Sequence, residues 1–333
     1  MELLIAILII VAGFYLYKSK SKIQPVKTSS DFKMGTDYAF GRGFPKMDAL
    51  AAEVFTASAK NGDVDAYAAL GNMYARGIHF KKDYEEAYKW LKLASDAGHA
   101  TAMFELSKFY IEGYGIPKDE KESIKLLKKS AELGESSAQS LLGMIYELGE
   151  FGVSIDAKES LNWYMKSSKG NNALAQLKVG DAYMEGSLLS KDAEKAFEYW
   201  TKSAENNNID AMKRLRLFYL DGVDNVEANL ELAFLWTFKA AELDDCESQR
   251  NLGVDFLLGA CGQVDYEQAA IWSKKAADKG DSQAQYTLGV MYKRGFFQGG
   301  ADLVEAKKWF QLAATQGLQQ AIDELNDANH VEV

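Results

Sequence analysis

One phrase of eight residues recurs through the chain and strongly limits what the chain can fold into. In residues 70–77 it reads Leu-Gly-x-x-Tyr-x-x-Gly, and its last glycine returns at intervals of 36 or 37 residues. Seven glycines occupy this last place: Gly77, Gly113, Gly149, Gly186, Gly222, Gly259 and Gly295. A fixed period of this length is typical of solenoids, in which each structural repeat packs mainly on its neighbours.

A second pattern alternates with the first and places a large residue four positions before a small one. The large residues are Trp90, Leu126, Trp163, Trp200, Trp236, Trp272 and Trp309, and the small ones are Ala94, Ser130, Ser167, Ala204, Ala240, Ala276 and Ala313. Residues four apart share one face of a helix, so each pattern predicts one helix. The first glycine of the phrase allows a close helix contact, and the last one ends the helix. The expected N-caps of second helices are aspartates: Asp83, Asp119, Asp156, Asp265 and Asp302.

Together the two patterns resemble the Sel-one-like repeat family, which is related to the tetratricopeptide repeat. Residues 283–295 (QAQYTLGVMYKRG) come close to the family consensus, and the resemblance extends from about Asp48 to Asn329. It implies an all-α chain that forms a right-handed α-solenoid superhelix of about seven helix-turn-helix repeats. We expect the solenoid to cover residues 47–329, with a half repeat at 47–62, full repeats from about 63 to 316 and a capping helix at 317–329.

A few residues depart from the repeat pattern or stand out in its loops. Arg216 takes the place of the first glycine in the fifth repeat. A long cation at a close helix contact has to reach solvent or widen the gap, so we expect the fifth repeat to be locally irregular. Three loop phenylalanines are expected to fold back onto a neighbouring repeat, with contact to a partner as the alternative: Phe151, Phe296 and Phe297.

The N-terminal region differs from the repeats. Residues 3–16 carry no charge, and three lysines follow them: Lys18, Lys20 and Lys22. This order favours an uncleaved membrane anchor over a signal peptide. We expect one transmembrane helix at residues 1–17, with membrane contact through residues 3–17, and a linker at 18–46. The positive-inside rule places the lysines in the cytoplasm, which predicts a single-pass protein of the bacterial inner membrane with a cytoplasmic repeat domain; a periplasmic domain is the alternative.

The composition argues for a binding protein. A formal net charge of −10 argues against nucleic acid as a partner, because nucleic-acid binding depends on lysine and arginine. Neither His-Glu-x-x-His nor a phosphate-binding glycine loop occurs in the sequence. We interpret the histidines as solvated surface residues: His79, His99 and His330. We therefore expect no enzymatic activity, no cofactor and no metal.

Cysteine usage bears on one further alternative. Some proteins of the resembled family are rich in cysteine and bind penicillin, but this chain has only Cys246 and Cys261. We expect both to be free thiols near the two ends of one helix, too far apart for a disulfide. The Ser-x-x-Lys sequence at residues 19–22 falls within the expected linker. A cysteine-poor relative of the penicillin-binding proteins is thus a distant alternative.

The resemblance implies that the first helix of each repeat lines a concave groove. One candidate residue directly follows each packing glycine or its replacement: Asn72, Lys108, Met144, Asp181, Leu217, Val254 and Val290. A second lies one helical turn further on: Arg76, Glu112, Leu148, Glu185, Asp221, Leu258 and Arg294. Such a mixture suits an amphipathic helix or an extended peptide. We predict a membrane-anchored scaffold that binds partner proteins or peptides there, with a periplasm-facing regulatory or ligand-sensing repeat protein as the alternative.

Overall fold

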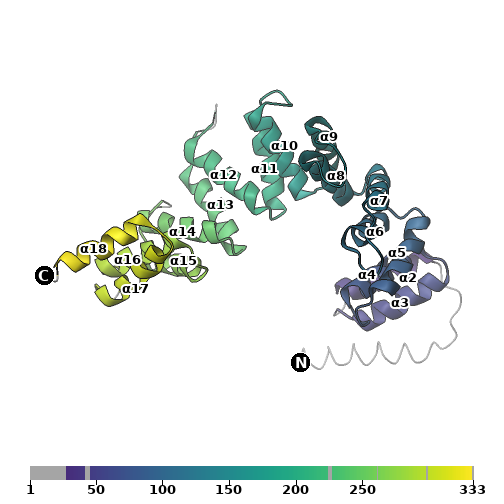
Figure 1. The fold of residues 1–333 in the computed structure, drawn as a ribbon, viewed down its shortest axis with the longest axis horizontal. Coiled ribbons are helices and arrows are strands. Elements are labelled where there is room, and N and C mark those ends of the chain that lie inside the picture. Colours follow the sequence, from purple (N-terminus) through teal and green to yellow (C-terminus); the bar gives the residue numbers. More distant parts are fainter. Residues whose placement is uncertain (1–27, 42–45, 224–226, 261, 298, 332–333) are drawn as a thin grey trace, which may run out of the picture. The chain divides into compact units, whose positions relative to one another are not determined.

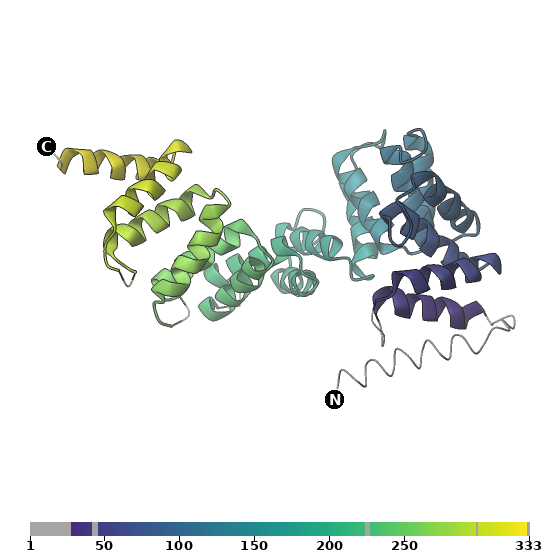
Figure 2. The ribbon, with the colours of Figure 1, turned by 90° about the horizontal axis from the view of Figure 1, so that it is seen from below.

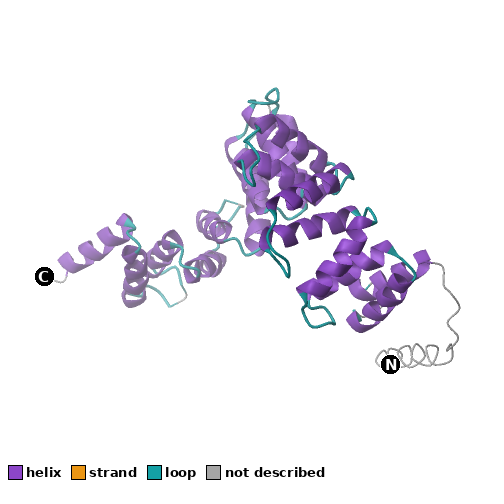
Figure 3. Cartoon of the chain, turned by 45° about the vertical axis from the view of Figure 1, so that its right-hand side comes forward, coloured by secondary structure: helices purple, strands orange, loops and turns teal. Residues whose placement is uncertain are grey.

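The protein is described by a computed structural model that covers residues 28–41, 46–223, 227–260, 262–297 and 299–331. The secondary-structure elements within these ranges are all α-helices, which confirms the predicted all-α class (Figure 1; Figure 3). The helices fall into two compact units, the first ending at Ala138 and the second beginning at Gln139.

The first unit is a succession of helices in which each packs against the next. Its complete helices are α2 (Thr28–Phe40), α3 (Asp48–Lys60), α4 (Val64–Arg76), α5 (Tyr84–Asp96), α6 (Ala100–Glu112) and α7 (Glu120–Glu132). The next helix, α8 (Ser136–Leu148), begins before the boundary between the units and lies mostly in the second.

The second unit continues the same alternation to the C-terminus. Its helices after α8 are α9 (Ala157–Ser168), α10 (Ala173–Glu185), α11 (Ala193–Glu205), α12 (Ile209–Asp221), α13 (Leu230–Glu242), α14 (Cys246–Leu258), α15 (Tyr266–Asp278), α16 (Ser282–Arg294), α17 (Leu303–Thr315) and α18 (Gln319–Val331). Figure 2 shows the last of them, in green to yellow, following one another toward the C-terminus. Even-numbered helices from α2 to α16, here called A helices, carry the Leu-Gly-x-x-Tyr phrase or a variant of it. Odd-numbered helices, called B helices, carry the tryptophan position.

A recurring set of backbone contacts joins the A helix of each repeat to its B helix. Asp83 caps α5 by accepting a hydrogen bond from the N–H of Glu86 at 3.0 Å, and its own N–H donates to the carbonyl of Tyr74 at 3.0 Å. The A helix before it ends at Gly77, whose φ of 70° is the left-handed conformation that glycine adopts without strain. All the predicted N-caps are confirmed: Asp83, Asp119, Asp156, Asp265 and Asp302.

The first glycine of the phrase is required by packing between the two helices. A Cβ atom on Gly71 would lie 2.6 Å from Cγ of Leu91, and one on Gly180 would lie 2.6 Å from Cδ1 of Trp200. Close-packed interiors do not hold carbon atoms at such distances, so a larger residue would push the helices apart. The close approach buries a row of residues at the preceding position: Leu70, Leu106, Leu142, Leu215, Leu252 and Leu288.

Arg216 occupies this glycine position in the fifth repeat. Its Nη1 donates to Oγ1 of Thr237 at 2.7 Å and to Oδ2 of Asp255 at 2.8 Å, and its side chain is only 16% exposed. The guanidinium is therefore mostly withdrawn from solvent instead of extending into it, which was one of the two expected outcomes, because a carboxylate on α14 supplies a countercharge. The expected irregularity is found where α12 ends, since Gly222 has a ψ of 151° in place of the 33° at Gly77.

Helix α2 corrects the expected linker. Residues 18–46 were expected to form a linker throughout, but residues 28–40 of this segment are helical and pack against α3. The helix forms because residues 34–41 read Met-Gly-x-x-Tyr-x-x-Gly, the repeat phrase with methionine in the place of leucine.

Helices α2 and α3 together have the geometry of a complete repeat. A Cβ atom on Gly35 would lie 2.6 Å from the ring of Phe55, as at the other packing glycines. The N–H of Met47 donates to the carbonyl of Tyr38 at 3.0 Å, the contact that Asp83 makes with Tyr74. An eighth repeat thus precedes the seven predicted ones, where only a half repeat at 47–62 was expected.

The two ends of the chain complete the fold. The transmembrane helix predicted at residues 1–17 lies outside the described residues, and no helix of the described ranges combines the length and the apolar character that crossing a bilayer requires. At the other end, α18 falls in the segment predicted as a capping helix, and its Ala321 is buried against Phe310 and Ala313. The predicted handedness of the superhelix stays a prediction.

Candidate partner-binding face

Two adjoining hollows lie over the A helices α8, α10 and α12 of the second unit. The first has a volume of about 320 Å³ and is lined by Asp181, Met184, Glu185, Trp200, Arg214, Leu217, Phe218, Asp221 and Val223. The second has a volume of about 490 Å³ and is lined by Met144, Glu147, Leu148, Tyr164, Leu174, Leu177, Lys178, Asp181, Asp210, Lys213 and Arg214. Because Asp181 and Arg214 line both, the hollows form one continuous surface, here called the A-helix face.

The A-helix face brings together part of the candidate set from the sequence. Six candidates from the third, fourth and fifth repeats line the hollows: Met144, Leu148, Asp181, Glu185, Leu217 and Asp221. The others lie outside them, on α4 and α6 of the first unit or on α14 and α16 of the second: Asn72, Arg76, Lys108, Glu112, Val254, Leu258, Val290 and Arg294. Their part in partner binding stays a prediction.

Exposed leucines border the hollows. Leu148 at the end of α8 is 54% exposed, and Leu217 in the middle of α12 is 52% exposed. Met184 and Phe218 contribute further apolar surface to the first hollow, and Phe218 itself belongs to the buried core around Trp200. The first hollow therefore has apolar walls fixed by the core and a leucine at its rim that remains in contact with water.

Asp181 organises the polar part of the first hollow. Its Oδ1 accepts a hydrogen bond from Nε1 of Trp200 at 3.0 Å and another from Nε of Arg214 at 3.1 Å. The indole donor is thus satisfied, and the Trp200 ring is held in one orientation against α10. Trp200 presents apolar ring surface to the hollow as a result.

Glu147 has the same organising role in the second hollow. Its carboxylate accepts from Nζ of Lys178 at 2.6 Å and from the hydroxyl of Tyr164 at 2.7 Å. Burial raises the pKa of Glu147, but the hydrogen bonds from Lys178 and Tyr164 outweigh burial and lower the pKa overall. The pKa of Tyr164 is raised by burial and by its bond to Glu147, so the tyrosine stays protonated. The group is a structural cluster that joins α8, α9 and α10.

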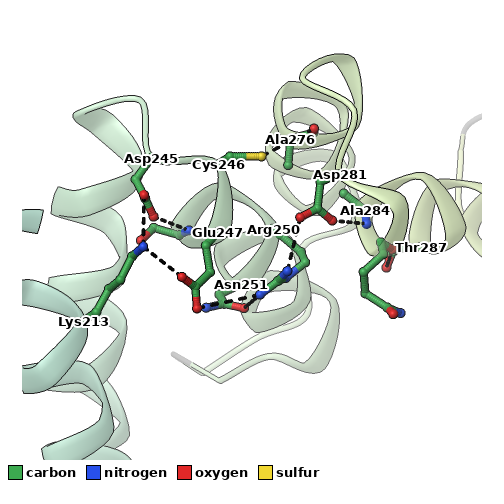
Figure 4. Close-up of polar contacts among 12 residues, drawn as sticks. Lys213, Asp245, Cys246, Glu247, Arg250, Asn251, Ala276, Asp281, Ala284 and Thr287 are labelled. Carbon is green, nitrogen blue, oxygen red and sulfur yellow. Dashed lines mark hydrogen bonds and ion pairs between the residues drawn. The ribbon is translucent and has the colours of Figure 1, made fainter. Parts of the chain in front are cut away.

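Ion pairs between successive A helices continue beyond the hollows (Figure 4). Nζ of Lys213 on α12 lies 3.1 Å from Oδ1 of Asp245, the N-cap of α14. Arg250 on α14 lies 3.1 Å from Asp281, the N-cap of α16. In each case a cation two residues before the motif leucine contacts the first turn of the next A helix. These pairs help to fix the register between repeats five, six and seven.

One histidine and one cysteine of the described chain have structural contacts, while His79 is exposed as expected. His99 was expected to be a solvated surface residue, but its Nδ1 accepts from the N–H of Ala102 at 3.0 Å and caps α6, while Nε2 lies 3.2 Å from Asp65. Cys246 forms no disulfide within the described chain, and its thiol lies 3.7 Å from the carbonyl of Ala276. Cys261 and the side chain of His330 lie outside the described residues. Over those residues no cluster of histidine, cysteine and carboxylate groups suits a metal ion.

Two of the three loop phenylalanines, Phe296 and Phe297, stack on tyrosines of the repeat helices. Phe296 stacks on Tyr266 with ring centroids 4.3 Å apart, and Phe297 stacks on Tyr292 at 4.2 Å. Phe296 therefore packs on the preceding repeat, as expected, whereas the stacking partner of Phe297 lies on α16 of its own repeat. Phe151 is half-buried in the loop after α8.

The sequence prediction missed several residues of the A-helix face. Lys178 and Arg214 lie three positions before the candidates Asp181 and Leu217, which is one helical turn earlier on the same stripe. Extending the stripe backward by one turn would have found both cations. The sequence analysis assigns Trp200 only to packing between helices. Trp200 also lines the first hollow because it lies against Gly180, and the repeat pattern does not reveal that position.

Fold and face together define a helical-repeat protein with an open surface on its A helices. The Sel1 repeat matches seven consecutive segments: residues 64–99, 100–135, 136–172, 173–208, 210–245, 246–281 and 282–318. The chain therefore belongs to the Sel1 repeat family, as the resemblance predicted. The eighth helix pair, residues 28–63, precedes the first matched segment.

Two solved structures share this fold. The chain is 27% identical to c5321, a protective antigen present in uropathogenic Escherichia coli strains with an SLR fold, with a TM-score of 0.73 over 89% of this chain and 63% of that chain. It is also 27% identical to a Sel1 repeat protein from Oxalobacter formigenes, with a TM-score of 0.60 over 90% of this chain and 86% of that chain. The chain thus spans less than two thirds of the E. coli protein. No curated protein matches the chain.

Proposed function

We propose that this protein is a scaffold that binds a partner protein or peptide on the A-helix face. The observation that carries the proposal is the exposure of Leu148 and Leu217 beside two hollows with apolar walls. Burying a leucine side chain against a partner contributes about 1.5–3 kcal/mol relative to leaving it in water. Sel1 repeat proteins generally mediate protein–protein interactions, which supports this reading.

A binding role fits the face better than catalysis. Two of the carboxylates that line the hollows are held in structural contacts, Glu147 by Lys178 and Tyr164, and Asp181 by Trp200 and Arg214. A general base has to reach a proton of the substrate, and these two are already engaged by internal donors. The other lining acids are exposed: Glu185, Asp210 and Asp221. We therefore propose that the protein is not an enzyme.

A membrane anchor at residues 1–17 belongs to the same proposal. It rests on the apolar stretch at 3–16 and on the lysines that follow it. Because the eighth repeat begins at Thr28, the segment that joins an anchor to the solenoid is residues 18–27, which reach at most about 35 Å when fully extended. We propose that the repeats are held close to the cytoplasmic surface of a bacterial inner membrane.

Site-specific crosslinking tests the binding face. A photo-reactive amino acid is placed at Leu217 in the full chain expressed in its native host, and the control is placed at Leu312, a 47%-exposed leucine on the B helix α17. We expect partner adducts from position 217 that are absent from position 312. The same adducts from both positions, or none from position 217, would contradict the proposed face.

Reporter fusions test the proposed location. A reporter that is active only in the cytoplasm and one that is active only in the periplasm are fused in turn after Val333. Activity of the cytoplasmic reporter alone is expected. Activity of the periplasmic reporter would overturn the lysine argument and favour the periplasm-facing regulatory protein.

A further inference from the structure

We infer that the partner presents a cationic amphipathic segment, which inserts an apolar side chain into the first hollow and pairs lysine or arginine with Glu185 and Asp221. This inference rests on the proposed function and adds to it the chemistry of the partner. It follows from three observations on the A-helix face: surplus negative charge, the place of two acids at helix ends, and the nature of the hollow's walls.

The first observation is the balance of charge around the hollows. Five carboxylates and three cations line them. The cations are already engaged: Lys178 with Glu147, Arg214 with Asp181, and Lys213 with Asp245 and Glu247. The remaining lining acids are exposed and make no ion pair with any residue that the structure describes: Glu185, Asp210 and Asp221. The A-helix face thus keeps an excess of negative charge for a partner.

The second observation is the position of two of these acids. Glu185 is the last residue of α10, and Asp221 is the last residue of α12. The carbonyl end of a helix dipole repels negative charge and favours cations. The equivalent residues of α4 and α16 are Arg76 and Arg294, which suit this position, whereas α6 ends with a third acid, Glu112, which lies outside the hollows. Acids at the ends of α10 and α12 are therefore unfavourable in the free protein, and a cationic partner supplies the missing compensation.

The third observation concerns the first hollow between the two acids. Its walls include Met184, Leu217 and Phe218, together with the ring of Trp200, whose N–H is already bonded to Asp181. An apolar side chain that enters the hollow therefore leaves no buried donor of this ring unsatisfied. Methionine adapts its shape readily, so the hollow suits several large apolar side chains. Acidic groups beside an apolar hollow select a segment that alternates apolar and basic residues.

Peptide binding to the full chain tests the inference directly. The protein is placed in nanodiscs of zwitterionic lipid, and binding of a fluorescent amphipathic peptide of leucine and lysine is measured by anisotropy, with empty nanodiscs subtracted. The probe for comparison has the same leucine pattern with glutamate in place of lysine. We expect the leucine–lysine peptide to bind at least about tenfold more tightly, with affinity that falls as salt is raised.

A matched pair of charge reversals identifies the residues. In Glu185→Lys/Asp221→Lys we expect a loss of affinity of about tenfold or more, because both attractions become repulsions. The control is Glu205→Lys/Glu242→Lys, which changes charge equally at the last residues of the B helices α11 and α13 of the same unit, where neither side chain lines the two hollows. We expect this control to stay within about twofold of wild type, since screening weakens distant charges. Lysine suits a helix end, so the first variant should melt at or above the wild-type temperature, and loss of binding is then not loss of folding.

A third variant separates this inference from the proposed function. Leu217→Ala removes apolar surface and leaves the acids in place, so it should weaken the leucine–lysine peptide. If Leu217→Ala weakens binding but the charge reversal does not, or if the glutamate peptide binds equally well, the cationic partner is wrong and the binding face stands. If neither peptide binds and crosslinking from position 217 yields no partner, both proposals are wrong.

Discussion

The fourth and fifth repeats satisfy the same packing position in opposite ways. In the fourth, Gly180 has no side chain, and Trp200 of the partner B helix lies directly against the backbone of α10. In the fifth, Arg216 fills the position and is neutralised by Asp255, which belongs to the next A helix. The glycine acts within one repeat, whereas the arginine ties its repeat to the following one. A packing glycine of a solenoid can therefore be replaced by a charged residue when the neighbouring repeat supplies a residue of opposite charge.

The position of Asp255 supports this view of a linked change. It lies two residues after the packing glycine of the sixth repeat. The repeat formed by α2 and α3 has a half-buried Asp37 at this position, and the other six repeats have residues without charge: Met73, Phe109, Ile145, Ala182, Phe218 and Met291. Most of these are buried, and Asp255 is also buried. A lone carboxylate there would be costly, and so would a lone guanidinium at position 216. The two departures from the repeat pattern are thus compatible with the fold only together.

The largest effect is expected from removing the carboxylate of this pair. Asp255→Met places at position 255 the residue that Met73 and Met291 represent in other repeats, but it leaves Arg216 buried without a countercharge. We expect the free energy of unfolding to fall by about 3 kcal/mol, at the low end for a broken buried pair because Arg216 keeps some exposure. Urea unfolding measures the loss, and hydrogen exchange should locate it in α12–α14.

A double variant checks the reason for that loss. Arg216→Met/Asp255→Met replaces the ion pair by two apolar side chains, an exchange that is often neutral or stabilising at buried sites. Stability within about 1 kcal/mol of wild type is expected. If the double variant is as unstable as Asp255→Met, the loss comes from altered packing at position 255 and the linked change is wrong.

Much of the fold could be predicted because the residues of the repeat phrase determine where each helix begins and ends. Asp83 and its equivalents cap B helices and Gly77 ends an A helix through contacts within a few residues, and such contacts are readable from spacing. The eighth repeat was missed although Gly35 stands 36 residues before Gly71. Methionine replaces the leucine before Gly35, and Met47 stands where most other repeats have an aspartate cap, so two of the strongest signals were absent.

The candidate face was predictable only in part, because it depends on contacts between repeats. The stripe through Asp181 and Leu217 follows from helical periodicity. The pairing of Arg216 with Asp255 joins residues 39 positions apart, and the repeat pattern of either helix alone does not reveal it. Two adjacent repeats depart from the repeat pattern with residues of opposite charge. This signal would have suggested the pairing.

The next largest effect is expected in the fourth repeat. Gly180→Ala adds a Cβ atom 2.6 Å from Trp200, whose ring is held by its bond to Asp181 and cannot easily retreat. Overpacking costs about 1–3 kcal/mol, and the gain of about 0.5–1 kcal/mol from replacing a helical glycine by alanine offsets part of it. A lower melting temperature is expected. The control is Ser107→Ala in the second repeat, where a Cβ atom is already accommodated; an equal loss in both variants would contradict the special tightness at Gly180.

A smaller effect is expected at Thr237, which contacts the guanidinium of Arg216 together with Asp255. Thr237→Val keeps the shape of the side chain but removes the oxygen that accepts from Arg216 at 2.7 Å. Asp255 still neutralises the charge, so the loss is confined to the two hydrogen bonds of the hydroxyl, the one from Arg216 and the one to the carbonyl of Ala233, and we expect a decrease of about 1 kcal/mol in the free energy of unfolding. In Arg216→Met/Asp255→Met the same Thr237→Val change should have a smaller effect, because only the bond to Ala233 is then lost. An undiminished effect there would mean that Thr237 acts through its bond to Ala233 alone.

The smallest effect concerns a more open ion pair between the same two helices. Lys213 joins α12 to Asp245 at the N-terminus of α14, and partly exposed pairs of this kind contribute about 0.5–1 kcal/mol. We expect Lys213→Met to lower the melting temperature slightly at pH 7, far less than Asp255→Met does, although both remove a link between α12 and α14.

The pH dependence shows whether the charge of Lys213 is responsible. Burial raises the pKa of Asp245, but hydrogen bonds from Ser248 and Lys213 outweigh burial and lower it below the ordinary value of 3.8. A carboxyl group with a lowered folded pKa stabilises the fold above its unfolded value and loses this contribution as the pH falls through the folded pKa. The difference in melting temperature between wild type and Lys213→Met should therefore shrink as the pH falls below about 4. A constant difference down to about pH 3 would mean that the aliphatic stem of Lys213, and not its charge, joins the two helices.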